Sequence, residues 1–167
     1  MEVKDNFLSN AHLTQLNELI DSYSFPWFFQ KEQVEEKDDG YFFSHILYDP
    51  NLEKSIFFDP VFNIFNSYLK YSFLCRCIVN LIPRQETPSI STFHTDFQDD
   101  VLKPDEDKIT TAIFYLNTNN GYTEFEGENR IDCVENRLVM FPAKTRHRAI
   151  GQTDVIQRIV LNFNFIF

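Results

Sequence analysis

The second half of the chain alternates between short apolar-rich segments and turn residues, and this pattern limits the fold more than any other feature. Each segment is short enough to be one β-strand, and successive residues of a strand point to opposite faces. Regularly spaced short strands of this kind are typical of a β-sandwich or a closed barrel. The expected strands are 72–82, 89–96, 108–117, 121–126, 129–132, 137–142, 146–150 and 155–167.

The last of these segments, "VIQRIVLNFNFIF", has two faces of different character. One face is nearly all apolar and consists of Gln157, Ile159, Leu161, Phe163 and Phe165. The other carries a guanidinium and two amides and consists of Ile156, Arg158, Val160, Asn162 and Asn164. We expect the apolar face to pack on helices and the polar face to line a pocket.

Two earlier segments have the spacing of helices. In "SNAHLTQLNELIDSY" the leucines recur at helical intervals, and Ser9 or Asn10 is available as the N-cap. In "DPVFNIFNSYLK" the expected N-cap is Asp59, with Pro60 at the first helical position. Its aromatic stripe predicts a face buried in the core.

The stretches "FPWFFQ" and "YFFSHILY" flank the charged run "KEQVEEKDDG", which predicts two strands joined by a solvated loop. The chain has neither an internal repeat nor a linker. The sequence therefore predicts one domain over 1–167, in which 1–70 is a supporting region of helices and a hairpin and 71–167 is the β core. The predicted class is mainly β with N-terminal helices.

Charge and cysteine content limit the partners and the compartment. A net charge of −10 makes tight, sequence-independent binding to nucleic acid unfavourable. The odd number of cysteines, Cys75, Cys77 and Cys133, argues for a reducing compartment, and we expect small buried side chains there. The sequence shows neither a signal peptide nor a long apolar run. We expect a soluble cytoplasmic protein without membrane contact, and its economy of length suggests a microbial or viral source. Nothing in the sequence indicates the oligomeric state.

The stretch "STFHTDF" places His94 and Asp96 on one face of the strand expected there. A second histidine, His147, lies in a distant segment, and Arg158 follows it in the last strand. Two histidines and one carboxylate form the facial triad that leaves open positions on a non-haem iron. A guanidinium nearby can hold a carboxylate through two parallel hydrogen bonds. Tyr115 lies on the same face of its expected strand as the residues that would line the pocket, so its hydroxyl could reach the same carboxylate. A structural position in the core or at the rim fits it nearly as well.

The order of these motifs resembles that of the 2-oxoglutarate and Fe(II)-dependent oxygenases, and within them the prolyl 4-hydroxylase branch. After the HxD motif come "YLN", then "GYTEF" with Gly121, Thr123 and Phe125, then "RLVMFPAKTRH" and an arginine. The resemblance covers 75–167. Several members of that branch carry a lysine at the position of Arg158, so the resemblance bears on the chemistry more than on the substrate.

This resemblance implies a double-stranded β-helix, the cupin-like jelly roll. Iron is then held by His94, Asp96 and His147, and the co-substrate 2-oxoglutarate chelates it through its keto acid. The far carboxylate pairs with Arg158, assisted by Tyr115. With O2, such enzymes convert 2-oxoglutarate to succinate and carbon dioxide and hydroxylate an unactivated C–H bond. The expected substrate is a peptide, protein or small molecule, with a peptidyl residue such as proline favoured.

Three alternatives remain open at this stage. Oxidative demethylation of nucleic acid is known in the same superfamily. It is disfavoured by the net negative charge of this chain, and because members of that type carry a further arginine in the last strands whereas none follows Arg158 here. A non-catalytic jelly-roll binding module is disfavoured by the intact triad. A halogenase is disfavoured because Asp96 occupies the position that such enzymes free for halide.

Several polar residues near the motif have two interpretations. Asp99 and Asp100 are either part of a solvated loop or an alternative ligand to Asp96, and Asp96 is favoured because only it lies on the same strand face as His94. The segment 98–108 is either a lid over the site or a disordered loop. Arg146 and Arg148 are either surface charges or substrate contacts, and His12 and His45 are expected to be structural.

Overall fold

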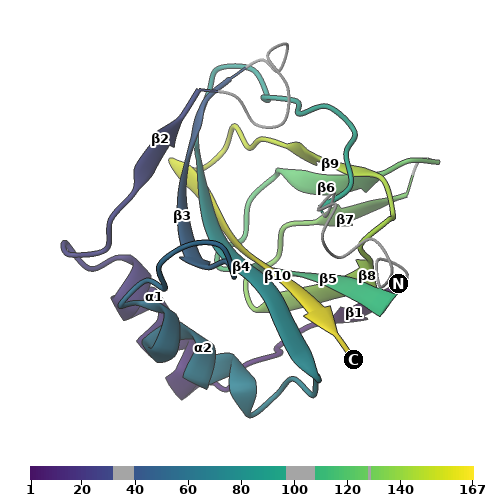
Figure 1. The fold of residues 1–167 in the computed structure, drawn as a ribbon. Coiled ribbons are helices and arrows are strands. Elements are labelled where there is room, and N and C mark those ends of the chain that lie inside the picture. Colours follow the sequence, from purple (N-terminus) through teal and green to yellow (C-terminus); the bar gives the residue numbers. More distant parts are fainter. Residues whose placement is uncertain (32–39, 97–107, 128) are drawn as a thin grey trace.

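Two antiparallel sheets and two helices make up the structure, a computed structural model that describes residues 1–31, 40–96, 108–127 and 129–167 (Figure 1). The elements are β1 (Glu2–Lys4), α1 (Asn10–Ile20), β2 (Phe28–Gln30), β3 (Phe42–Tyr48), α2 (Phe58–Asn66), β4 (Phe73–Pro83), β5 (Ile109–Tyr115), β6 (Tyr122–Phe125), β7 (Arg130–Asp132), β8 (Arg137–Pro142), β9 (His147–Ile150) and β10 (Gln157–Ile166). Within these residues the larger sheet has the order β1-β8-β5-β10-β4-β3-β2 and the smaller one β7-β6-β9. The prediction of a mainly β protein with N-terminal helices is confirmed.

Both helices lie against one face of the larger sheet, and the smaller sheet faces the other side (Figure 1). Helix α1 begins as predicted, because the Ser9 hydroxyl accepts a hydrogen bond from the His12 backbone N–H at 3.3 Å. Helix α2 begins at Phe58, so Asp59 lies in its first turn and the prediction of Asp59 as N-cap was wrong. Starting earlier buries Phe58. No helix in the described part of the chain is long and apolar enough to cross a membrane.

The core lies between the helices and the central strand β10. As predicted, one face of β10 is apolar and packs with the helices, through Ile159, Leu161, Phe163 and Phe165. The Phe163 ring lies 4.8 Å from the ring of Phe65 on α2, measured between centroids. Since β10 is hydrogen-bonded to both β4 and β5, this packing fixes the strand whose other face forms the pocket.

We expect Phe163→Ala to lower the free energy of unfolding by about 3–5 kcal/mol, because the side chain is fully buried and its removal leaves a cavity. Urea unfolding followed by circular dichroism measures this. The matched control is Phe167→Ala, since Phe167 is 55% exposed and its loss is expected to cost about 0.5 kcal/mol or less. Equal losses in the two variants would contradict the assignment of this face to the core.

Two local predictions differ from the structure. Segment 89–96 is not a regular strand, because it pairs with β9 only through isolated bridges, Ile90 with Ile150 and His94 with His147. Strand β1 was missed, since three residues are too few to show an alternating pattern, yet it pairs with β8. The N-terminal region thus supplies three strands of the larger sheet, β1, β2 and β3. The charged loop expected after β2 lies almost wholly outside the described residues.

The three cysteines are free and buried, as expected for small apolar side chains. Cys75 and Cys77 nevertheless belong to different clusters of the core. Asn164 and Phe165 of β10 pair with Arg76 and Leu74, so Cys75 is the extra residue of a β-bulge in β4, and this bulge interrupts the alternation of that strand.

Candidate functional site

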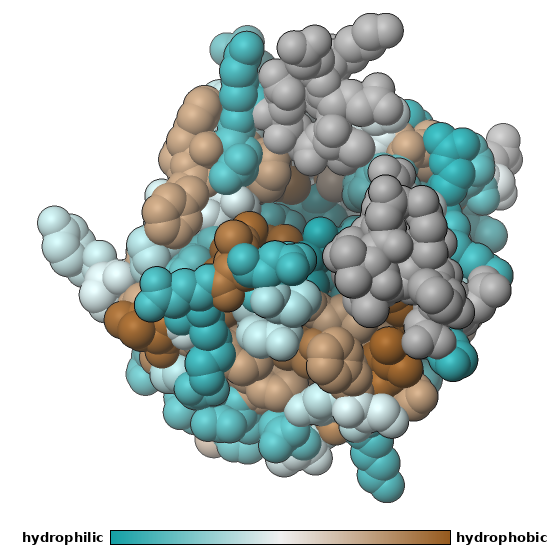
Figure 2. Space-filling view, viewed as in Figure 1, coloured by the Kyte–Doolittle hydropathy of each residue, from teal (hydrophilic) through white to brown (hydrophobic). Residues whose placement is uncertain are grey.

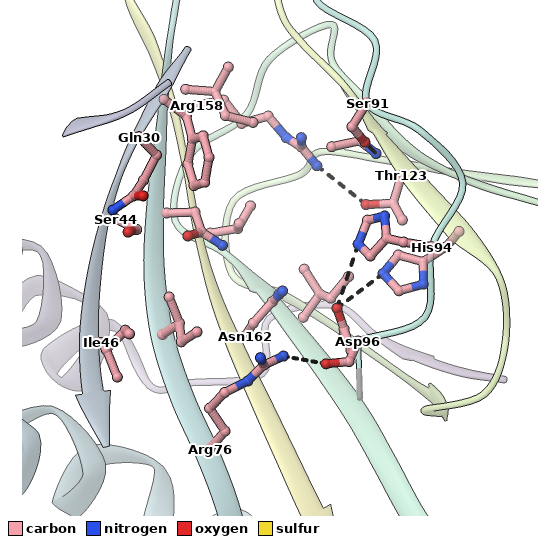
Figure 3. Close-up of a pocket in the computed structure, with 18 of the residues that line it drawn as sticks. Gln30, Ser44, Ile46, Arg76, Ser91, His94, Asp96, Thr123, Arg158 and Asn162 are labelled. Carbon is pink, nitrogen blue, oxygen red and sulfur yellow. Dashed lines mark hydrogen bonds and ion pairs between the residues drawn. The ribbon is translucent and has the colours of Figure 1, made fainter. Parts of the chain in front are cut away.

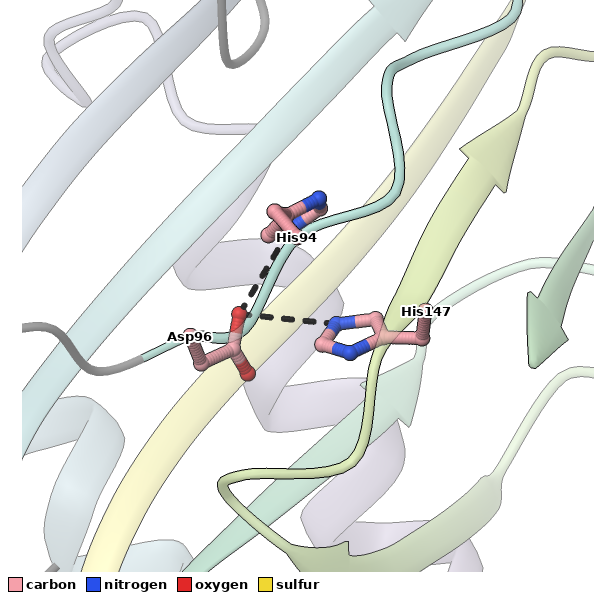
Figure 4. A group of neighbouring side chains, drawn as sticks. All are labelled: His94, Asp96 and His147. Atoms are coloured by element: carbon pink, nitrogen blue, oxygen red, sulfur yellow. Dashed lines mark ion pairs between the residues drawn. The ribbon is translucent and has the colours of Figure 1, made fainter. Parts of the chain in front are cut away.

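His94, Asp96 and His147 meet on the side of the larger sheet away from the helices (Figure 4). The Asp96 Oδ1 atom lies 3.5 Å from His147 Nε2 and 3.8 Å from His94 Nε2. One ligand atom from each residue lies within 4.8 Å of the others, so these three described residues could hold a metal ion. Two imidazoles and one carboxylate on one side of an ion leave its other positions open to ligands.

Backbone pairing brings the two histidines together although they are distant in sequence. The N–H of each donates to the carbonyl oxygen of the other, both at 2.9 Å. Strand β9 is in turn paired with β6, which anchors His147 in the smaller sheet. The predicted strand at 89–96 was therefore wrong in extent, but one of the two isolated bridges that do form aligns His94 with His147.

A backbone carbonyl orients each imidazole ring. His94 Nδ1 lies 3.0 Å from the Thr92 oxygen, and His147 Nδ1 lies 3.0 Å from the Thr145 oxygen. A carbonyl oxygen only accepts, so in both rings Nδ1 carries the proton and donates it. When a ring is neutral, as metal binding requires, its Nε2 lone pair is therefore directed toward the site, which is the usual arrangement of metal-binding histidines.

The Asp96 carboxylate is held in its charged form. Burial alone would raise its pKa, but the hydrogen bond from His147 and the positive charges of His147, Arg76 and His94 outweigh burial and lower the pKa to about 2. For His147, burial would lower the pKa, and the hydrogen bond and charge of Asp96 reverse this and raise it. An anionic, buried carboxylate is the form that a divalent cation requires.

The three side chains open into a cavity of about 430 Å³. Its floor is the pocket-facing side of β10 and β4, and the hairpin β2–β3 forms one wall (Figure 3). In the space-filling view the same region is hollowed and hydrophilic at its bottom (Figure 2). Cavities of this size hold small-molecule ligands. The predicted polar face of β10 lines it with Arg158, Val160 and Asn162.

Arg158 is buried and fixed on two sides. Its Nε donates to Cys133 Sγ at 2.9 Å and its Nη2 to Thr123 Oγ1 at 3.3 Å. Burial raises the pKa of the Cys133 thiol, so the sulfur accepts as a neutral group. The remaining nitrogen, Nη1, has no hydrogen-bond partner within the described residues. The guanidinium is therefore rigidly held with one donor group left over.

Tyr115 reaches this arginine indirectly. Its hydroxyl donates to Thr123 Oγ1 at 2.7 Å, and its ring centroid lies 5.9 Å from the Arg158 Cζ. Burial raises the pKa of the phenol and so keeps it protonated as a donor. Thr123 Oγ1 accepts from both Tyr115 and Arg158, which leaves its own proton free to point into the cavity that it lines. A direct contact between Tyr115 and a ligand stays a prediction.

Sequence reasoning did not assign roles to Thr123 and Cys133. Thr123 lies in the "GYTEF" motif, where its parity with Phe125 was visible, but its two hydrogen bonds join strands that only the fold brings together. Cys133 lies just after β7, and nothing in its sequence neighbourhood indicates that it faces an arginine.

Buried polar atoms without partners show whether iron and 2-oxoglutarate fit this site. Three such atoms belong to residues lining the cavity: Asp96 Oδ2, Arg158 Nη1 and Asn162 Oδ1. Leaving a buried polar atom unpaired costs about 1–3 kcal/mol. A cation at Asp96 and a carboxylate at Arg158 would supply opposite charges to two of them. The donor set therefore fits a divalent metal together with a dicarboxylate.

The remaining predicted residues lie away from the cavity or outside the described part. Arg146 pairs with Glu126 at 3.2 Å, and Arg148 pairs with Glu124 at 2.5 Å. His12 is hydrogen-bonded to Tyr68, and His45 packs among aromatic rings, consistent with structural roles. Asp99, Asp100 and all of segment 98–108 except Lys108 lie outside the described residues.

Solved structures match this fold over almost the whole chain. No family model and no curated protein matches the sequence. A 2OG-Fe(II) oxygenase family oxidoreductase from Burkholderia pseudomallei aligns with 95% of this chain and 80% of its own at 12% identity, with a TM-score of 0.67. The chain has the fold of the 2OG-Fe(II) oxygenases. The jelly roll expected from the resemblance is confirmed.

Prolyl hydroxylases are among the similar structures. One from Trichoplax adhaerens, in complex with a hypoxia inducible factor oxygen degradation domain peptide fragment, is 16% identical with a TM-score of 0.60 and aligns over 99% of this chain and 82% of its own. A Pseudomonas putida prolyl-4-hydroxylase is 17% identical with a TM-score of 0.58, covering 99% of this chain and 91% of its own. At these identities the likeness bears on the fold and not on the substrate.

Proposed function

We propose that the protein is an Fe(II)- and 2-oxoglutarate-dependent dioxygenase that uses O2 to hydroxylate an unactivated C–H bond. The observation that carries the proposal is the pairing, in one cavity, of a triad of possible metal ligands with a buried arginine that has a free donor. Neither feature is needed by a jelly roll that only binds a partner. A buried guanidinium without an anion is costly.

In this proposal His94, Asp96 and His147 hold Fe(II), and Arg158 with Thr123 binds the far carboxylate of 2-oxoglutarate. Bound Fe(II) and 2-oxoglutarate would together activate O2 for the hydroxylation. The chain's own residues bind and orient the co-substrate. Apolar side chains between the two ends, Ile113 and Val160, exclude water from the middle of the cavity.

For the primary substrate we propose a peptidyl residue, with proline favoured. The part of the cavity wall that the β2–β3 hairpin supplies is neutral and includes Gln30, Ser44 and Ile46 (Figure 3). Such a wall offers hydrogen bonds to amides and contact to an aliphatic ring. The hairpin residues that line the cavity offer no cation to a phosphodiester, which disfavours nucleic acid as the substrate. A cytoplasmic location and an assignment of 1–167 as one oxygenase domain, supported by 1–70, are parts of the same proposal.

Anaerobic titration tests the enzyme assignment. Fe(II) followed by 2-oxoglutarate is expected to produce the weak visible charge-transfer band of a chelated keto acid. Absence of this band at saturating iron and co-substrate would overturn the proposal and favour the binding-module alternative.

A second experiment addresses the substrate. With O2 admitted, succinate release is measured with proline-containing peptides and with methylated single-stranded DNA. Stimulation by peptide, together with a mass increase of one oxygen atom, supports the peptidyl substrate. Stimulation by DNA alone would replace it with the demethylase alternative.

A further inference from the structure

Asp96 has little regular structure to hold it in place. It follows the single bridge at His94 and belongs to neither sheet. Its Oδ1 faces the two histidines, and its Oδ2 has no partner within the described residues. A carboxylate so placed needs some other contact to fix its direction, because ligand geometry at a metal depends on the groups around the ligands.

That contact comes from Arg76 on β4. Its Nη2 donates to the backbone carbonyl oxygen of Asp96 at 2.5 Å (Figure 3). Its Nε donates to Asn164 Oδ1 on β10 at 3.1 Å. Asn164 is fully buried, and its Nδ2 donates to Thr111 Oγ1 on β5 at 3.0 Å.

These residues form a line across the larger sheet. Asn164 lies directly opposite Arg76 in one strand pair and opposite Thr111 in the other. The line therefore joins β5, β10 and β4 at one level and ends on the main chain of Asp96. A guanidinium held at Nε has few rotamers left, so the position of Nη2 follows from the register of the sheet.

We propose that Arg76 is a positioning residue of the metal site, which fixes Asp96 relative to His94 and His147 and so sets the affinity for the metal. The inference rests on the proposed metal site. Arg76 contributes through Asp96 and also brings a positive charge near the carboxylate, which keeps it anionic before the metal arrives.

The test is the binding of Co(II), without 2-oxoglutarate, by the purified full chain. Losing a partner outside the ligand set typically weakens metal affinity by about 10–100-fold, so we expect Arg76→Met to bind Co(II) at least about 10-fold more weakly. The visible spectrum of the loaded variant is expected to change as well, because the carboxylate approaches from another direction. Arg76→Lys keeps the charge but cannot bond Asn164 and Asp96 in the same way, so we expect an intermediate affinity.

The matched control is Arg146→Met. Arg146 also donates to a backbone carbonyl of this segment, that of Phe93 at 3.2 Å, but it is exposed and has no contact with Asp96. Exposed contacts contribute little, so its affinity for Co(II) is expected to stay within about twofold of the parent. Thermal unfolding without metal separates a loss of folding from a loss of binding.

The outcomes are distinguishable. Parent-like Co(II) affinity in a folded Arg76→Met variant would overturn the positioning role and leave the proposed function intact. If Arg76→Met does not fold, the Co(II) affinities of Arg76→Lys and Asn164→Leu test the positioning role instead. Parent-like affinity in both variants would overturn that role. A parent chain that binds no Co(II) would instead overturn the metal site itself, and the positioning role with it.

Discussion

Asp96→Asn is expected to weaken Co(II) or Fe(II) binding by at least about 100-fold. The substitution keeps the shape of the side chain and removes the anion that faces both histidines at 3.5 and 3.8 Å. Loss of a neighbouring group alone costs up to about 100-fold, and loss of a ligand charge is expected to cost more. Isothermal titration under anaerobic conditions measures the affinity directly.

A stability measurement provides an independent readout of the same change. Metal at about 100 times its dissociation constant stabilises a folded protein by about 2.7 kcal/mol, and this increment is expected to disappear in Asp96→Asn. The matched control is Asp132→Asn, since Asp132 is exposed on β7 and its carboxylate forms an ion pair with Arg130 away from the cavity. Parent-like binding in Asp96→Asn would show that this carboxylate is not a ligand.

The residues that form the site could be selected from the sequence because each has a simple local signal. Arg158 was visible as a charged residue on the polar face of an otherwise apolar strand, and β10 has that form. His94 and Asp96 were paired by strand parity. The structure brings them together with His147, although the segment is held by a bridge instead of a strand. The parity argument thus identified the right neighbours from an incorrect local structure.

What the sequence could not predict are the contacts between strands far apart in the chain. Arg76 lies between two cysteines in "LCRC", and its sequence neighbours do not indicate that its side chain donates a hydrogen bond to the backbone of Asp96. Cys133 is expected from the sequence only as a small buried side chain, yet its sulfur accepts a hydrogen bond from Arg158. Such contacts depend on register and on the bulge in β4, which are set by packing and not by local alternation. The Asp59 cap failed for a related reason, since burial of Phe58 moved the start of the helix.

Arg158→Met is expected to weaken 2-oxoglutarate binding by about 100-fold or more while leaving metal affinity nearly unchanged. Truncating one partner of a buried charge pair costs about 2–5 kcal/mol, and each 1.4 kcal/mol is about tenfold in affinity. The metal ligands do not depend on this guanidinium, which donates its hydrogen bonds to Cys133 and Thr123. The measurement is the anaerobic titration of the iron-loaded protein, followed by its charge-transfer band. Arg137→Met is the matched control, since that arginine pairs with Asp5 outside the cavity.

Comparison with pyruvate, a keto acid that lacks the second carboxylate, distinguishes loss of a specific charge pair from general damage. The parent is expected to prefer 2-oxoglutarate strongly. In Arg158→Met this preference is expected to collapse, because both keto acids then bind only through the metal and the apolar middle of the cavity. The collapse is an interaction energy between the guanidinium and one carboxylate, so damage that weakens both ligands equally cancels out of it. If the preference survives the substitution, the far carboxylate is bound elsewhere, and Arg158 has a structural role through Cys133 and Thr123.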